Sequence, residues 1–157
     1  PPPPPPLFFF HPEPANADAQ ESRGLGDVYK RQKSIRHLEK KRVVVFAAGT
    51  GNPFFSTDTA ASLRASEMNC SKIIKATKVD GIYDSDPKLN LTAKHFSEVT
   101  YDTILQKNLK VMDASAIALA RDNGIPIIVF SLKSEDGISS IVSGKGKFTK
   151  IIPTKEI

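Results

Sequence analysis

The chain has 157 residues, a net charge of +5 and a single cysteine, Cys70. One cysteine excludes an intrachain disulfide and a cysteine-built metal cluster, and it fits a reducing compartment, so we expect a cytoplasmic protein. No apolar run of the sequence is long enough to cross a bilayer. Because the basic excess is small and no run of basic residues is long enough for a DNA-binding arm, we expect no nucleic acid as partner, and we expect no membrane either.

Residues 1–32 differ in composition from the rest of the chain. Six prolines are followed by Leu7 and three phenylalanines, and then by a polar stretch without periodicity. A polyproline run favours an extended helix that has no internal hydrogen bonds. We therefore expect a disordered or non-native leader over 1–32 and a folded domain over 33–157. A proline-rich ligand for a recognition domain is the alternative interpretation of the leader.

From residue 33 onward, apolar runs alternate with helical patterns. Residues 34–41 resemble the end of an exposed helix, and the continuous apolar run over 42–47 predicts a buried strand. Further strands are expected over 72–77, 126–130 and 148–152. Helices are expected from Thr57 or Asp58 to about Met68, over 101–107, from Asp113 to Gly124 and over 136–142. This alternation predicts an α/β fold with a mostly parallel sheet.

A loop rich in glycine, hydroxyl groups and phenylalanine follows the first predicted strand. Gly49 and Gly51 allow the backbone to approach a ligand closely. The loop leads into a predicted helix, and the first N–H groups of a helix attract anions because they lack partners within it. Phe54 and Phe55 offer flat faces for a base, and Asn52 offers an amide. We expect a nucleoside monophosphate here; a glycine turn with two core phenylalanines is the alternative.

A second candidate loop, residues 76–87, follows the strand predicted over 72–77. Thr77 lies where that strand ends, and Lys78 offers a charge for a phosphate. Tyr83 offers an aromatic face, and Asp86 offers an acceptor for a ribose hydroxyl or an amine. Two ordinary turns, one at Asp80 and one at Asp86, are the alternative explanation.

Asp58 and Asp113 each lie at the start of a predicted helix. Capping of a helix stabilises it by about 0.5–2 kcal/mol and accounts for both residues without a catalytic role. The sequence contains no Walker A motif of the Gly-x-x-x-x-Gly-Lys-Ser/Thr kind.

Taken together, these motifs resemble the bacterial-type uridylate kinases (UMP kinases) of the amino acid kinase superfamily. The resemblance covers residues 33–157 and rests on runs in the same order and spacing: 49–61, 76–83 with Asp86 and Pro87, 110–113 and 126–130. It implies a three-layer α/β/α sandwich with a mostly parallel sheet, here incomplete. It also implies ATP-dependent phosphorylation of UMP to UDP with Mg²⁺, a step in pyrimidine and CTP biosynthesis.

The resemblance also assigns roles to individual residues. Eight residues of the glycine loop would bind UMP: Thr50, Gly51, Asn52, Pro53, Phe54, Phe55, Ser56 and Thr57. Thr77, Tyr83 and Asp86 would contact ATP. Asp58 resembles the superfamily aspartate that orients catalytic lysines, and Asp113 is a second catalytic candidate; no metal ligand is assigned. A homohexamer regulated by GTP and UTP is typical of the family.

Two family motifs that help to hold the phosphates, Lys-x-Ser-Gly-Glu and Gly-Gly-Gly-Asn, do not occur in this sequence. We therefore expect the chain by itself to be inactive or nearly so. Three alternatives remain open. One is another amino acid kinase acting on aspartate, glutamate or carbamate; one is a non-catalytic nucleotide-binding module; the weakest is a basic RNA-binding domain, whose binding would depend on salt.

Overall fold

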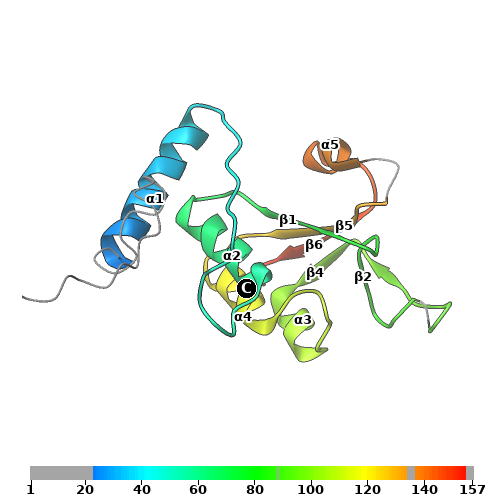
Figure 1. Cartoon of the computed structure of the whole chain (residues 1–157). Helices are drawn as coiled ribbons and strands as arrows, with labels where there is room; N and C mark the ends of the chain where they lie inside the picture. Colours follow the sequence, from blue (N-terminus) through cyan, green and yellow to red (C-terminus); the bar gives the residue numbers. More distant parts are fainter. Residues whose placement is uncertain (1–22, 88, 134–136, 155–157) are drawn as a thin grey trace, which may run out of the picture. The chain divides into compact units, whose positions relative to one another are not determined.

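The computed structural model describes residues 23–87, 89–133 and 137–154, and it divides the chain into two units, residues 1–46 and 47–157 (Figure 1). In the first unit, helix α1 spans Arg23–Glu39 and so continues across the boundary expected after residue 32. That boundary stays a prediction, since most of the leader lies outside the described residues. Among the described helices, none is both long and apolar enough to span a membrane.

The strand predicted over residues 42–47 does not form. These residues belong to neither sheet of the structure, and the side chains of Val43 and Val45 are 92% and 85% exposed. β-branched residues favour strands, but a strand persists only when its N–H and C=O groups pair with a neighbour. The prediction was wrong because an apolar run favours a strand but does not supply the neighbouring strand with which it must pair.

The second unit is built on a four-stranded sheet with the order β1-β5-β6-β4. Its strands are β1 (Ile73–Thr77), β4 (Glu98–Thr100), β5 (Ile127–Ser131) and β6 (Phe148–Ile152). β1 pairs with β5 and β4 with β6 in parallel, whereas β5 and β6 are antiparallel. The mostly parallel sheet is confirmed; β4 was not predicted.

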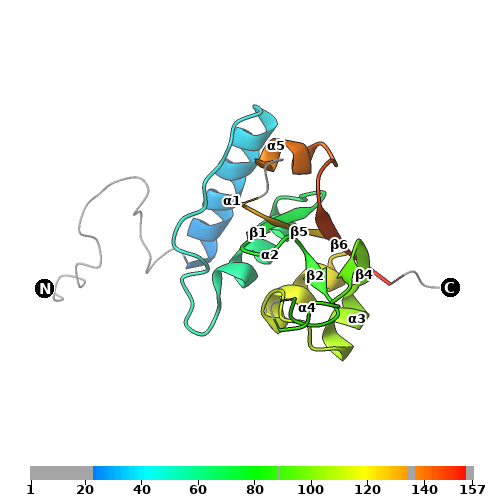
Figure 2. The ribbon, with the colours of Figure 1, turned by 90° about the vertical axis from the view of Figure 1, so that its right-hand side faces the viewer.

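Helices cover both faces of this sheet. The helices of the unit are α2 (Thr57–Glu67), α3 (Tyr101–Gln106), α4 (Ala114–Asp122) and α5 (Gly137–Val142). Ile127 and Val129 of β5 belong to a core cluster with residues of α2, α3 and α4, whereas Ile128 and Phe130 pack with Ile141 of α5. Successive strand residues point to opposite faces, so α5 lies on the other side of the sheet, as Figure 2 shows. The three-layer α/β/α fold is confirmed.

A serine cap and an aspartate cap fix where α2 and α4 begin. The Asp113 carboxylate accepts from the Ala116 N–H at 2.7 Å and caps α4, as predicted. The cap of α2 is Ser56, whose hydroxyl accepts from the N–H groups of Asp58 and Thr59 at 3.0 and 3.3 Å. The sequence predicted Thr57 or Asp58 for this position, and the shift leaves the Asp58 carboxylate free to bind another partner.

Candidate active site

The glycine loop, residues 49–57, is exposed along its middle. Gly49 and Gly51 have φ angles of +63° and +72°, which glycine adopts without strain. Phe54 is fully exposed and Phe55 is about half exposed. The alternative interpretation, in which these phenylalanines fill the core, is therefore wrong. Their rings remain accessible to a ligand, and a contact with UMP stays a prediction.

Hydrogen bonds give the loop a turn at its start and an anchor at its end. The Asn52 N–H donates to the Thr50 hydroxyl at 3.1 Å. The Ser56 hydroxyl donates to the carboxylate of Asp113, which lies at the start of α4. The end of the loop is thereby joined to a second helix 57 residues further along the chain.

Asp113 joins the N-terminal ends of α2 and α4. Besides capping α4, its carboxylate accepts from the hydroxyls of Thr59 and Ser115, each at 3.0 Å. Burial by itself raises the pKa of Asp113, but the hydrogen bonds from Ser56, the Ala116 N–H, Ser115 and Thr59 outweigh it and lower the pKa below its ordinary value. These contacts explain Asp113 as a structural carboxylate, and its catalytic role stays a prediction.

Asp58 pairs with a lysine that was not singled out from the sequence. Its Oδ2 atom lies 2.5 Å from Nζ of Lys75, in the middle of β1, and the two side chains are only 29% and 22% exposed. A lone charge in the strand sequence Ile73–Thr77 is a signal that could have identified Lys75, because buried charges need partners. The structure thus pairs Asp58 with a lysine. The role of Asp58 in orienting a lysine for catalysis stays a prediction.

The three residues expected to contact ATP line one cavity. Thr77, Tyr83 and Asp86 border a cavity of about 550 Å³, together with Lys75 and Lys110. This volume lies within the range of roughly 300–1,000 Å³ that is usual for small-molecule sites. The structure thus brings together side chains from two strands and two loops, with an aromatic ring, hydroxyls, a carboxylate and two cations around one space.

A polar network holds the wall of this cavity. The Tyr83 hydroxyl donates to Oδ1 of Asp80 at 2.8 Å, and Nζ of Lys147 lies 2.5 Å from Oδ2 of Asp80 and 3.2 Å from the Tyr83 hydroxyl. Burial by itself raises the pKa of Asp80. The hydrogen bonds from Lys147 and Tyr83 outweigh this effect, so the pKa of Asp80 is below its ordinary value. The hydrogen bond to Asp80 raises the pKa of Lys147. Sequence reasoning missed Lys147.

Close packing explains why residue 81 is a glycine. The residue lies just before β2 (Ile82–Tyr83), which pairs antiparallel with β3 (His95–Phe96). A Cβ atom on Gly81 would overlap the His95 ring and the Thr149 hydroxyl. The Ile82 N–H donates to that hydroxyl at 2.8 Å, so the β2–β3 hairpin is fixed against β6. The hairpin leaves Tyr83 on the cavity wall, and both the ATP contact and the alternative of two ordinary turns stay predictions for this segment.

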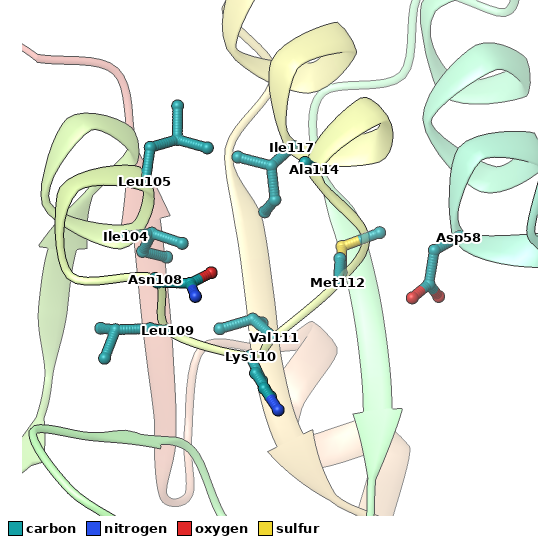
Figure 3. Close-up of a pocket in the computed structure, with 10 residues that line it drawn as sticks. All are labelled: Asp58, Ile104, Leu105, Asn108, Leu109, Lys110, Val111, Met112, Ala114 and Ile117. Atoms are coloured by element: carbon teal, nitrogen blue, oxygen red, sulfur yellow. The ribbon is translucent and has the colours of Figure 1, made fainter.

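A smaller cavity of about 310 Å³ adjoins the first (Figure 3). Residues 108–111 line both cavities. Asp58 lines the smaller cavity and its partner Lys75 lines the larger one, so this ion pair lies between them. The eight residues expected to bind UMP line neither of these two cavities, and neither does Lys78.

The described residues include no group of three or more His, Cys, Asp or Glu side chains arranged to hold a metal ion. Mg²⁺ in nucleotide sites usually keeps several waters and binds one or two carboxylates together with the phosphates. Asp86 offers one such carboxylate in the larger cavity, which fits that pattern.

Several curated proteins are similar to this chain. The uridylate kinase of Roseobacter denitrificans is 59% identical over 127 residues, which are 81% of this chain and 52% of that protein. The uridylate kinase of Wolbachia pipientis is 59% identical over 128 residues, 82% of this chain and 51% of that protein. The chain thus spans about half the length of the curated relatives it matches.

Solved structures agree with these matches. The UMP kinase of Ureaplasma parvum superposes with a TM-score of 0.74 at 40% identity, covering 78% of this chain and 52% of that chain. An aspartate kinase from Synechocystis gives a TM-score of 0.59 at 27% identity, covering 78% of this chain and 21% of that chain. The sequence model described as "Amino acid kinase family" matches residues 14–131. This chain therefore belongs to the amino acid kinase family.

Proposed function

We propose that this chain takes part in the transfer of a phosphoryl group from ATP to UMP, giving UDP. The observation that carries the proposal is the larger cavity, which gathers Thr77, Tyr83 and Asp86 beside two lysines. The choice of UMP as acceptor is supported by the relatives at about 60% identity, which are uridylate kinases.

The donor side of the reaction requires positioning and neutralisation of charge rather than covalent chemistry. We assign the adenosine of ATP to the wall formed by Thr77, Tyr83 and Asp86, where hydroxyls, an aromatic ring and a carboxylate are available. Lys75 is held by Asp58 at 2.5 Å, so its ammonium is fixed in direction at the edge of the cavity. Mg²⁺, bound through the phosphates and Asp86, would supply further neutralisation of the phosphate charge.

We assign the acceptor to the glycine loop. The exposed rings of Phe54 and Phe55 offer stacking faces for a pyrimidine, and the glycines at 49 and 51 leave the backbone open to a phosphate. No atom lies within 4 Å of a Cβ placed on either glycine, so a ligand can approach there. The loop leads directly into the N-terminal end of α2, which favours negative charge.

The proposal is tested by titrating the 157-residue chain with ATP and with UMP in a calorimeter, and by a coupled assay for UDP. We expect both nucleotides to bind. Because the Lys-x-Ser-Gly-Glu and Gly-Gly-Gly-Asn motifs are missing from the sequence, we expect turnover below about a tenth of that of the Roseobacter denitrificans enzyme, since transition-state charge would be poorly stabilised. Absence of binding by both nucleotides would contradict the proposal.

A second candidate function is phosphorylation of an amino acid. The structural likeness to an aspartate kinase at 27% identity favours it. The same titration with aspartate, glutamate and carbamate in place of UMP separates the two functions. We expect UMP to be the ligand that binds. A clear preference for aspartate would show that aspartate, and not UMP, is the acceptor.

Assembly, regulation and location are further proposals from the family resemblance. We propose a homohexamer that responds to GTP and UTP in the cytoplasm. Light scattering with and without each nucleotide checks the assembly, and the expected result is a single species six times the mass of the chain.

A further inference from the structure

Lys147 lies immediately before β6 and has no part in the function proposed above. Side chains alternate between the two faces of a strand, so residues 147 and 149 share one face. Thr149 is fully buried, and its hydroxyl accepts from the Ile82 N–H of the hairpin at 2.8 Å. Phe148 points to the opposite face and packs with the cluster that contains Ile141 of α5. The alternation along β6 therefore directs Lys147 toward the β2–β3 hairpin.

The Lys147 ammonium contacts both partners of one hydrogen bond in this part of the chain. The Tyr83 hydroxyl donates to Oδ1 of Asp80 at 2.8 Å. Nζ of Lys147 lies 2.5 Å from Oδ2 of the same carboxylate, 3.2 Å from the Tyr83 hydroxyl and 5.7 Å from the centre of the Tyr83 ring. Tyr83 lines the larger cavity, whereas Lys147 and Asp80 line neither of the two cavities. The hydroxyl end of Tyr83 is thus held by residues outside the cavity wall.

A third neighbour restrains the Tyr83 ring. The His95 ring in β3 meets it edge to face, with centroids 5.2 Å apart and 75° between the planes, a favourable geometry for two aromatic rings. Nε2 of His95 in turn lies 3.3 Å from the Thr149 hydroxyl. Tyr83 is therefore supported directly by Lys147 and indirectly by Thr149 through His95. A side chain restrained in this way before a ligand arrives loses little rotamer freedom on binding.

We propose that Lys147 is a positioning residue that holds the Tyr83 ring in the orientation in which it contacts the base of ATP. The inference rests on the proposed function, because it takes ATP as the occupant of the larger cavity. Since the Tyr83 hydroxyl is bonded to Asp80 and lies beside Lys147, the ring is the part of Tyr83 left for a base. Aromatic contacts depend on the orientation of the ring, so Lys147 changes affinity without touching the nucleotide.

The first test measures binding of ATP and of AMP to the full 157-residue chain by calorimetry. We expect Lys147→Met to weaken both nucleotides about fivefold, because both carry the base and a mobile Tyr83 must then be ordered on binding. Lys147→Arg keeps a charged donor and should stay within about twofold of the unaltered chain. Lys150→Met is the matched control, because Lys150 lies in β6, pairs with the carboxylate of Glu98 and lines neither cavity. Its affinities should be unchanged.

The second test shows whether Lys147 acts through Tyr83. In Tyr83→Phe the hydroxyl beside Lys147 is missing, so adding Lys147→Met should weaken ATP binding by less than about twofold. A thermal melt of every variant separates this effect from a loss of fold. Because the Lys147 side chain is 55% exposed and its ion pair is screened by solvent, we expect Lys147→Met to melt close to the unaltered chain.

Several results overturn the inference, and they differ in what they say about the proposed function. Unchanged affinities in Lys147→Met, or equal weakening in Lys150→Met, remove the positioning role and leave the proposed function standing. Weakening of ATP alone, or a fivefold loss that persists in Tyr83→Phe, shows that Lys147 acts on the nucleotide directly. A matching loss of thermal stability shows that Lys147 supports the fold. Failure of the unaltered chain to bind either nucleotide overturns both proposals.

Discussion

The glycine loop and the β2–β3 hairpin are both assigned to nucleotides, but they are held in place in different ways. Two sets of hydrogen bonds fix the hairpin. The Ile82 N–H donates to the Thr149 hydroxyl, and the Lys147 ammonium donates to the Asp80 carboxylate and the Tyr83 hydroxyl. The glycine loop is anchored at its end through Ser56, while Phe54 in its middle is fully exposed.

Because of this difference, the two regions are expected to contribute differently to ligand affinity and to the free energy of unfolding. A ligand that enters the cavity beside the hairpin meets a wall that is already formed, so little ordering is needed. A ligand that binds the glycine loop must order exposed phenylalanine side chains, which costs conformational entropy. Side-chain contacts of the hairpin are therefore expected to contribute to the free energy of unfolding, and the exposed side chains of the loop to contribute mainly to ligand affinity.

The largest change in stability is expected for Gly81→Ala. The added Cβ overlaps His95 and Thr149, and the φ angle of +155° is strained for alanine. We expect a loss of about 3 kcal/mol in the free energy of unfolding. Urea denaturation measures it.

Gly51→Ala is the matched control for this substitution. Its φ angle of +72° is also positive, but a Cβ there meets open space. The expected loss is about 1 kcal/mol, from the left-handed backbone alone. Equal losses at both positions would show that the hairpin is not packed as described.

The next largest effect is expected at the Asp58–Lys75 pair. Since both side chains are mostly buried, removing one leaves the other charge poorly solvated. We expect a coupling energy of about 1 kcal/mol in a double-mutant cycle of Asp58→Asn and Lys75→Met. The exposed pair Arg121–Asp122 is the control, with a coupling near zero. A coupling no larger than that of the control would contradict the arrangement.

Lys147→Met is expected to have a smaller effect, under about 0.5 kcal/mol, because its side chain is 55% exposed and solvent screens the pair. The folded pKa of Asp80 lies below its ordinary value of 3.8. Its contribution to stability is thus complete above pH 3.8 and is lost as the pH falls through the folded value. Unfolding measured from pH 7 to pH 2 should show less acid sensitivity in Lys147→Met than in the unaltered chain; identical curves would argue against the network.

The smallest change in stability is expected for Phe54→Ser, because Phe54 contributes no buried surface. The free energy of unfolding should stay within about 0.5 kcal/mol. UMP affinity should fall about fivefold if the ring stacks on the base. Calorimetric titration with UMP, and with ATP as the ligand for comparison, measures the effect. A large loss of stability with unchanged UMP affinity would reverse the contrast drawn between loop and hairpin.

Features that depend on residues close together in the sequence were predicted correctly. The strands near 73–77 and 127–131 follow from short apolar runs, and the cap at Asp113 follows from a side chain that reaches its own helix. Thr77, Tyr83 and Asp86 were singled out from the sequence as parts of one loop, and the family resemblance supplied ATP as their expected ligand. The cap at Ser56 was missed because Thr57 and Asp58 are also good cap residues.

The sequence by itself determined the α/β alternation, the helix at Asp113 and the run of loop residues that identifies the family. Tertiary structure decided which strands have partners, that β6 runs antiparallel to β5, and which charges meet: Asp58 with Lys75, and Asp80 with Lys147. The reason is physical. Capping and periodicity act within a few residues, whereas strand pairing and ion pairing join groups that the chain brings together only after it folds.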